Sequence, residues 1–391
     1  MTEFSIASFN VKNLIGADEE YYRFESYTPE EYAWKEDWLA DQLLSMDSDI
    51  VCFQEIFEES ALREVIAETN ARGRAANEAV VPDRTKRYAR KAIFRKLAFA
   101  PYEPLHLAFA ANVNDGAPGA RRPGLAVLSR FPFVGEVEVI QELATPLTIP
   151  FADLGGDDGG SYTIRRTSRP IMKLRVDVGG TVITVFNCHL KSKLGEFMPG
   201  GAERDLVNYD AAGRALGALR SALRRMAEAW VLRREVLKSL EAGEPVMVLG
   251  DFNDGEHAVS SEIISGEAPF KNYAWIRRHD AEHRSDRYTD EEDTLIRTQM
   301  EAVRLHSAEK LFVAKSLRDM VFTTSFGGTF ESIDQILMSR HFLPGHGSSL
   351  GQMEYFSVLN DHLTDGAHPE APYNKLASDH GQIIAHMRLT P

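Results

Sequence analysis

The stretch V-M-V-L-G-D-F-N-D at residues 246–254 joins a short apolar strand to a group of polar side chains. Four apolar residues lead into a glycine, and Asp251, Asn253 and Asp254 follow where such a strand has to end. Alternate residues of an extended segment share a face, so Asp251 and Asn253 would present a carboxylate and an amide near one point. The same residue types also form ordinary turns. The rest of the chain therefore decides whether this stretch aims ligands into a cleft or only reverses direction.

The composition is that of a large globular protein with an acidic surface. The chain has 391 residues, of which 43% are hydrophobic and 26% are charged, and its formal net charge is −14. This apolar content is enough for a large core. The net charge works against indiscriminate binding to nucleic acid, but it leaves room for a local basic groove. Cys52 and Cys188 lie in apolar runs and are expected to be core residues, without a disulfide or zinc role.

The sequence predicts a protein that does not span a membrane. No apolar run approaches the length of a transmembrane helix. Residues 1–7 lead directly into a strand pattern, without the charged-then-apolar order of a signal peptide. A cytoplasmic location follows if residue 1 is the native N-terminus, and a secreted mature form is the alternative.

The hydrophobic pattern predicts more strands than helices. Helices are expected from Thr28 onward, where a capping threonine and a proline precede two acids, and over 62–76 and 211–240. Helices alternate with groups of strands, which favours two sheets packed face to face with helices outside. No linker divides residues 1–391, so a single domain is expected. The main predicted strands are 4–9, 49–53, 105–111, 125–129, 170–178, 181–188, 246–249, 332–338 and 382–387.

Six different strand ends carry carboxylate, amide or imidazole side chains. Taken singly, each has an ordinary explanation, such as a turn residue, a helix N-terminal acid, a core histidine or a buried acceptor. Six such ends together favour a shared site, and metal-assisted phosphoester hydrolysis is the chemistry that needs these groups. The residues are Asn10, Glu55, His189, Asp251 with Asn253, Asp334, and Asp379 with His380.

Each group has a place in that chemistry. Glu55 and Asp379 offer the oxygen ligands that a hard cation such as Mg²⁺ prefers. Asn253 can orient a water molecule, and Asp251 can accept its proton.

The two histidines have separate roles in this hypothesis. A histidine held by a carboxylate, as His380 would be by Asp334, stays in one tautomer and gains basicity. It can then act as a base or as a cationic contact to phosphate. His189 would be a second donor to a phosphate oxygen.

Six motifs in order resemble the endonuclease/exonuclease/phosphatase superfamily. This group includes DNase I-like nucleases, AP endonucleases, inositol polyphosphate 5-phosphatases and neutral sphingomyelinases. The resemblance implies an α/β fold, a four-layered sandwich of two mixed β-sheets with helices outside, and cleavage of phosphoesters that depends on Mg²⁺ or Mn²⁺. The motifs are S-F-N-V-K-N-L (8–14), D-I-V-C-F-Q-E (49–55), F-N-C-H-L-K-S-K (186–193), G-D-F-N-D (250–254), S-I-D-Q-I-L-M-S (332–339) and S-D-H (378–380).

The resemblance also implies residue roles. Glu55 resembles the principal metal ligand, with Asp379 and Asn10 close to the metal. Arg169 and Lys191 resemble contacts to the substrate phosphate. The residues Asp251, Asn253, His189, Asp334 and His380 carry over as the catalytic group.

Two positions depart from the family pattern. Lys12 stands where some members have an acid, and Gln335 replaces a neighbour of Asp334 that can help to bind substrate. The motif combination is closest to bacterial nuclease-like members. Segments around 202–240 and 255–320 are longer than a minimal core needs, and we expect them to be insertions where substrate choice can lie.

The substrate remains open between two classes. A phosphodiester in nucleic acid is the first hypothesis, and a small phosphate ester or a phospholipid headgroup is the alternative, which the net charge of −14 slightly favours. A non-catalytic binding module is less favoured, because the central residues are all present. The basic cluster at 84–96 is interpreted as a solvated helix face, with contact to an anionic substrate as its alternative. No protein partner is implied.

Overall fold

The computed structural model describes most of the chain. The described residues are 2–21, 25–79, 96, 98–113, 121–152, 159–195, 211–266, 290–314, 321–326, 329–363 and 376–390. They form two six-stranded mixed sheets and a small two-stranded sheet of β10 (Thr324–Phe326) and β11 (Thr329–Glu331).

The first sheet has the strand order β13-β14-β1-β2-β4-β3. β1 pairs in parallel with β2 and antiparallel with β14, which closes the chain back onto its first strand. The bounds are β1 Thr2–Leu14, β2 Ile50–Ile56, β3 Leu107–Ala110, β4 Gly124–Ser129, β13 Gly351–Leu359 and β14 Gln382–Leu389.

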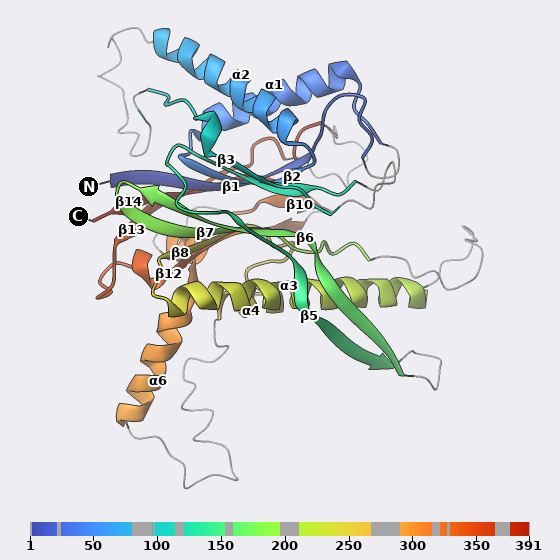
Figure 1. Cartoon of the computed structure of the whole chain (residues 1–391), viewed down its shortest axis with the longest axis vertical. Coiled ribbons are helices and arrows are strands. Elements are labelled where there is room, and N and C mark those ends of the chain that lie inside the picture. The colour runs from blue at the N-terminus through green and yellow to red at the C-terminus, as the bar shows by residue number, and fades with distance from the viewer. Residues whose placement is uncertain are drawn as a thin grey trace.

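The second sheet has the order β5-β6-β7-β8-β12-β9. Its centre is the parallel pair β7 and β8, and β5 and β6 extend beyond the sheet as a long hairpin (Figure 1). The bounds are β5 Glu138–Ala152, β6 Gly159–Val178, β7 Thr181–His189, β8 Val246–Asp251, β9 Leu305–Ser307 and β12 Asp334–Ser339.

Helices cover the outer faces of both sheets, which confirms the predicted four-layered α/β sandwich (Figure 1). α1 and α2 lie over the first sheet, and α3 and α4 lie over the second. A capping box between Thr28 and Glu31 starts α1 where the sequence predicts it. The helices are α1 Pro29–Met46, α2 Glu59–Glu78, α3 Ala211–Glu241, α4 Val259–Ser265, α6 Asp290–Val303 and α7 Ala308–Val313, with short 3₁₀ turns η2 Pro104–His106 and η3 Arg340–Phe342.

The alternation of side chains along each strand builds three apolar layers. On β1, Phe4 and Ile6 point between the two sheets, whereas Ala7 and Phe9 pack under α1 and α2. The third layer lies between the second sheet and α3, where Phe186 is fully buried. Cys52 and Cys188 are both buried, as predicted for core residues.

Two expectations need correction. β1 does not end at Asn10 but continues to Leu14 after an irregularity in its pairing with β2. The predicted helices also omit the segment from 260 to 294, which includes α4 and the start of α6, while 267–289 lie outside the described residues.

Two further predictions concern surface and membrane. Of the basic cluster at 84–96, Lys96 is the member that the structure describes, and its Nζ donates to Asp49 Oδ1 at 2.7 Å. This is a structural ion pair, and the rest of the cluster lies outside the described residues. Among the described helices, none has the length and apolar character needed to cross a bilayer.

Candidate functional site

Three neighbouring strands of the second sheet place His189, Asp251 and Asp334 at one level. His189 is the register partner of Asp251 in the parallel pair β7 and β8, and Asp334 faces Asp251 in the antiparallel pair β12 and β8. Gly250 prepares this edge with a φ of 144°, and a Cβ there would lie 1.8 Å from the Cys188 carbonyl oxygen. Only glycine fits so close a backbone approach. The stretch 246–254 therefore ends a strand and places Asp251 level with His189 and Asp334.

The first sheet contributes Asn10 and Glu55 through two backbone irregularities. Asn10 is the register partner of Gln54, and the pairing shifts immediately after both residues. Glu55 has a φ of 65°, a left-handed conformation that is uncommon outside glycine. Bulges of this kind re-aim side chains and are frequent near active sites. Asn10 Nδ2 then donates to Asp251 Oδ2 at 3.1 Å, so the edges of the two sheets meet at this point.

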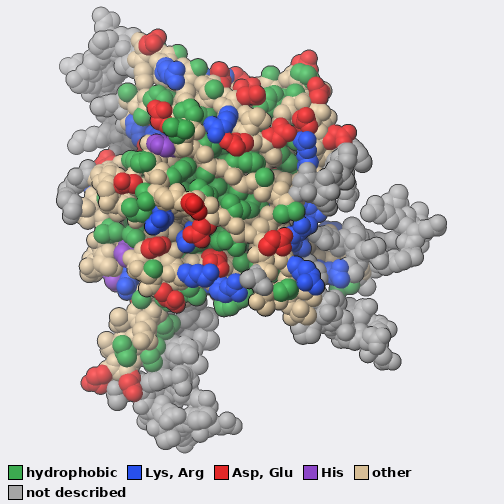
Figure 2. All heavy atoms as spheres, in the orientation of Figure 1, with side chains coloured by type: hydrophobic (Ala, Val, Ile, Leu, Met, Phe, Trp, Pro, Cys, Tyr) green, Lys and Arg blue, Asp and Glu red, His purple; other side chains and the backbone are tan. Residues whose placement is uncertain are grey.

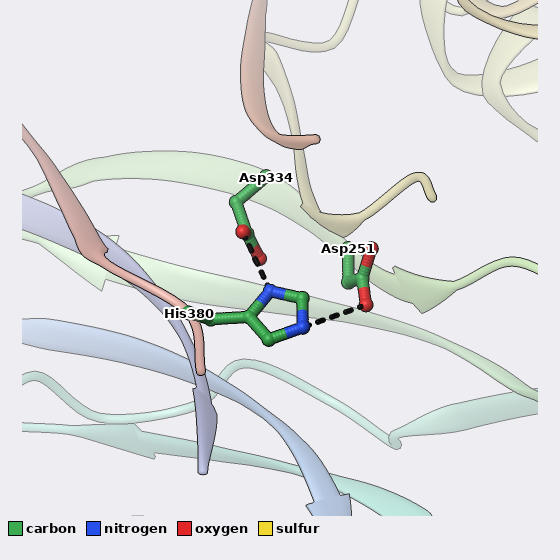
Figure 3. A group of neighbouring side chains, drawn as sticks. All are labelled: Asp251, Asp334 and His380. Carbon is green, nitrogen blue, oxygen red and sulfur yellow. Dashed lines mark hydrogen bonds and ion pairs between the residues drawn. The ribbon is translucent and has the colours of Figure 1, made fainter. Parts of the chain in front are cut away.

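His380 lies between two carboxylates, as Figure 3 shows. Its Nδ1 is 2.8 Å from Asp334 Oδ2, and its Nε2 is 3.8 Å from Asp251 Oδ2. Ser378 holds the loop in place, because its Oγ donates to the Asn10 carbonyl and accepts from the His380 backbone N–H.

Burial and charge set the protonation of this group. Burial disfavours a charged ring, but the carboxylates of Asp334 and Asp251 outweigh it and hold the pKa of His380 well above its usual value. Burial also raises the pKa of Asp251 to about 7, against the lowering effect of His380. At neutral pH His380 therefore carries its second proton, and Asp251 is near the midpoint of its titration.

His189 is a buried neutral imidazole on the other side of Asp251. Its Nε2 lies 3.2 Å from Asp251 Oδ2 and 4.0 Å from Glu55 Oε1. Burial lowers its pKa well below the usual value, and the positive charges of Arg169, His380 and Lys191 lower it further. The ring therefore stays uncharged at neutral pH and can donate one proton from Nε2.

A loop beside His189 gathers the other predicted residues. The Leu190 carbonyl accepts from Asn253 Nδ2 at 3.0 Å and from Arg169 Nη1 at 3.2 Å. The Asn253 backbone N–H donates to Asp251 Oδ1 at 2.8 Å. The positive charges of Arg169 and Lys191 both lower the pKa of His189.

Glu55 and Asp379 occupy different surroundings. Glu55 Oε2 accepts from the Asn13 backbone N–H at 3.0 Å, and its side chain is 17% exposed. Asp379 is 58% exposed, and its carboxylate lies 3.8 Å from Lys12 Nζ. The structure thus places Asp379 at the rim of the site, beside the lysine that replaces an acid of some family members.

One cluster has the ligand spacing of a metal site. Among the described residues, Asp251, Asp334 and His380 each offer a ligand atom, and these atoms lie within 4.8 Å of one another. Asp334 Oδ2 is hydrogen-bonded to His380 Nδ1, so the same three residues can instead share protons without a metal ion. Glu55 lies outside this cluster and is the alternative position for an ion.

Gln335 faces away from the site. Residues next to each other on a strand point to opposite faces, so Gln335 leaves β12 on the side opposite Asp334. Its Nε2 donates to the Asp254 carbonyl at 2.8 Å and to Ser261 Oγ at 2.9 Å. The change at this position therefore alters the support of the 251–254 loop, not the face that bears Asp334.

The sequence analysis missed a buried amide pair that joins the sheets under the site. Gln54 Nε2 donates to Asn187 Oδ1 at 2.8 Å, and Asn187 Nδ2 donates to the carbonyls of Phe53 and Ala126. Both amides are fully buried. Gln54 precedes Glu55, and Asn187 lies two residues before His189, so this pair fixes the spacing of the two sheets where the site residues emerge.

Lys35 of α1 was also missed. It is fully buried, and its Nζ donates to the carbonyls of Val11 and Leu376, each at 3.0 Å. Burial and the charge of Lys12 lower its pKa to about 7, although Glu55 and Asp379 oppose the shift. The sequence did contain a signal for its burial. Lys35 lies one helical turn before residue 39, and residues 39, 43 and 46 follow one another at the same spacing on the buried face of the helix.

These observations agree with a comparison against known families. Residues 7–380 match the model of the endonuclease/exonuclease/phosphatase family. The chain belongs to the endonuclease/exonuclease/phosphatase family. Members of this family are phosphoester hydrolases that typically use a divalent metal ion. No curated protein matches the chain.

Solved structures resemble the chain at low sequence identity. An endonuclease/exonuclease/phosphatase from Beutenbergia cavernae is 15% identical with a TM-score of 0.44, over 100% of this chain and 72% of that one. Truncated Caenorhabditis elegans TDP2 is 14% identical with a TM-score of 0.47, over 98% and 97%. The Bacteroides thetaiotaomicron mannosyl-6-phosphatase Bt3783 is 12% identical with a TM-score of 0.44, over 99% and 100%.

Proposed function

We propose that this chain is a phosphodiesterase that cleaves nucleic acid by attack of water on a phosphate, assisted by Mg²⁺ or Mn²⁺. The observation that supports it is the Asp251 carboxylate. It is buried, receives Asn10 from the other sheet, and lies between His189 and the Asp334–His380 pair. Hydrolysis of a phosphodiester needs a base, an acid or cation, and ligands for a metal at one place, and these groups meet there.

We assign the metal site to Glu55, with Asn10 and Asp379 nearby. The left-handed backbone of Glu55 presents a partly exposed carboxylate beside His189, and carboxylate and amide oxygens suit a hard cation. When bound, the ion supplies charge neutralisation to the phosphate. Lys12 already places a positive charge 3.8 Å from Asp379, which disfavours a second cation at the rim.

Asp251 is the proposed base. Its pKa of about 7 matches the pH at which an acceptor of a proton from water works best. The Asn253 N–H fixes Oδ1, and Asn10 Nδ2 fixes Oδ2. The carboxylate is thus held in one orientation, and the Asn253 side chain lies beside it to position the water.

The histidines and the two cations contact the phosphate in this proposal. His380 is kept charged by Asp334 and can donate from Nε2 to a phosphate oxygen. His189 is neutral and donates without adding charge. Arg169 of β6 and Lys191 of the loop after β7 supply positive charge and bind the negatively charged group.

The choice of nucleic acid rests on basic side chains beyond the site. Arg165 and Arg166 are exposed on β6, the strand that carries Arg169. Figure 2 shows Lys and Arg side chains spread at the level of α3, whereas acidic side chains gather over α1 and α2. A chain of phosphates would extend along the basic side of the molecule. The net charge of −14 favours the second candidate, a small phosphate ester or phospholipid headgroup.

An activity panel separates these candidates. Purified protein is incubated with plasmid, single-stranded and double-stranded oligonucleotides, and RNA, with Mg²⁺, Mn²⁺ or EDTA. Parallel reactions contain inositol phosphates, sphingomyelin and bis-p-nitrophenyl phosphate. Absence of metal-dependent cleavage of any DNA or RNA would refute the nuclease assignment. Activity confined to the inositol phosphates, sphingomyelin or bis-p-nitrophenyl phosphate would support the alternative substrate class. Unaltered activity in Asp251→Asn would refute the assignment of Asp251 as the base.

A further inference from the structure

Helix α3 turns two charged residues toward the loops around the site. Arg225 is 8% exposed and Glu228 is 1% exposed, and the two are three residues apart, so they lie on one face of the helix. A buried carboxylate is costly unless its oxygens are hydrogen-bonded. The partners of both side chains therefore show what this face of α3 is for.

Glu228 binds the backbone of two segments that carry cations, one within β6 and one in the loop after β7. Its Oε1 accepts from the backbone N–H and the Oγ of Ser168, each at 2.6 Å, and from Arg224 Nε on the same helix at 3.2 Å. Its Oε2 accepts from the Lys191 backbone N–H at 2.8 Å. Ser168 directly precedes Arg169, so one carboxylate fixes the backbone at both proposed phosphate contacts.

Arg225 binds the loop at 251–254. Its Nε donates to Asp254 Oδ2 at 2.7 Å, and its Nη1 donates to the Lys191 carbonyl at 3.2 Å. Asp254 Oδ2 also accepts from Ser260 Oγ at 2.6 Å. Asp254 thus anchors the end of the stretch 246–254 to α3. The backbone of Lys191 is bound to α3 through both its N–H and its carbonyl group.

Hydrogen bonds also join the segments at Arg169, Leu190 and Asn253 to one another. The Leu190 carbonyl accepts hydrogen bonds from both Arg169 and Asn253. A displacement of the backbone at 190–191 would therefore move Arg169, Lys191 and Asn253 together. The hydrogen bonds from α3 are the fixed points of this arrangement, because the helix itself packs on the second sheet through an apolar layer.

We propose that Glu228 and Arg225 are positioning residues that hold Arg169 and Lys191 for binding of a phosphate group. The proposal rests on the proposed function, in which these two cations contact the substrate phosphate. The sequence predicts an insertion at 202–240 where substrate choice can lie, and α3 occupies most of that segment. In this proposal the helix holds the phosphate-binding loops in place before substrate binds. A purely structural ion cluster would affect folding stability and leave phosphate affinity unchanged.

The test compares binding of inorganic phosphate, in the presence of Mg²⁺, by the parent and by Glu228→Gln, using calorimetry. The amide keeps the shape but replaces one acceptor oxygen by a donor, so Ser168 or Lys191 loses its partner. We expect the dissociation constant for phosphate to rise roughly ten- to hundredfold. The matched control is Glu235→Gln on the same helix, where the carboxylate pairs with Lys238 and Arg234, and its affinity should equal that of the parent.

Ser168→Ala provides a milder variant if Glu228→Gln does not fold. It removes the Oγ bond to Glu228 and leaves the backbone bond, so weaker phosphate binding by several-fold is expected. Unchanged affinity in a folded Glu228→Gln or Ser168→Ala would overturn the proposal, as would absence of phosphate binding by the parent. A parent that binds phosphate but hydrolyses no ester would refute the proposed function and leave this comparison valid.

Discussion

Replacing Lys35 by methionine should change how the stability of the fold depends on pH. Methionine has a similar length but neither charge nor hydrogen-bond donors. The substitution removes one buried titrating group and the two hydrogen bonds to Val11 and Leu376. These carbonyls belong to the segments that present Asn10 and His380, so Lys35 lies directly beneath the site.

The magnitude follows from the two pKa values of Lys35. The pKa is 10.5 for an ordinary lysine and about 7 in the folded protein. Between these values the unfolded chain binds a proton that the folded chain lacks, so the free energy of unfolding rises with pH, by about 1.4 kcal/mol per pH unit. Below pH 7 both states are protonated, and the contribution of Lys35 is at its minimum. From pH 7, where the folded amine is half protonated, to pH 9 the parent should therefore gain roughly 2.3 kcal/mol relative to the variant.

At any one pH, two opposing effects determine the difference in free energy of unfolding between the parent and Lys35→Met. Loss of the donors leaves two buried carbonyls unpaired, at about 1–3 kcal/mol each. Removal of a buried charge restores several kcal/mol when that charge is present. Near pH 6 these effects nearly cancel, so the variant should be about as stable as the parent. At pH 9 the parent amine is neutral, and the variant should be clearly less stable.

Urea denaturation at pH 6, 7, 8 and 9, in the presence of EDTA, measures this difference. EDTA keeps divalent ions away from Glu55, which contributes to the pKa of Lys35. The control is Lys238→Met, because the side chain of Lys238 is 64% exposed and lies on the helix surface. Parallel pH curves for the parent and Lys35→Met would refute the assignment of a neutral buried amine.

Three further predictions test the site. Asp334→Asn leaves an acceptor for His380 but removes the charge that keeps the ring protonated, so kcat should fall by about 10²–10⁴; steady-state rates within threefold of the parent would contradict the pairing. Glu55→Gln should weaken Mg²⁺ binding by roughly tenfold or more, and equal affinities in calorimetry would show that the ion is held elsewhere. Gly250→Ala should lower the free energy of unfolding by more than about 2 kcal/mol, because its Cβ would lie 1.8 Å from the Cys188 carbonyl oxygen; urea denaturation with an unchanged midpoint would disprove this constraint.

Local patterns were sufficient to predict most of the layers and the residues at strand ends. The strand at 246–249 and its polar end follow from a run of apolar residues and a glycine, both readable within one short stretch. Thr28 signalled the start of α1 in the same way, since a capping box depends only on neighbouring residues. The same logic identified His189 and Asp334, which end or begin strands that are mainly apolar.

Features that depend on distant pairing were not predictable. The sequence pattern ends the first strand at Asn10, but pairing with β2 resumes at Leu14 opposite Ile56, after an irregularity in which Lys12 and Asn13 have positive φ. The left-handed conformation of Glu55 has no local signal, because the bulge arises from how β2 pairs with β1 and β4. The ion pair of Asp379 with Lys12, a residue near the other end of the chain, also had no local signal.

Glu228 shows why a residue can matter at a site and escape a search of strand ends. It lies in the middle of a long helix rich in Ala, Leu and Arg, where an acid ordinarily belongs to a solvated face. Its burial arises because the backbone N–H groups of Ser168 on β6 and of Lys191 after β7 face α3, and those groups need acceptors once water is excluded. These backbone donors therefore require an acceptor on the helix, and the carboxylate of Glu228 supplies it. The same requirement explains Lys35, which satisfies two carbonyls beneath the opposite side of the site.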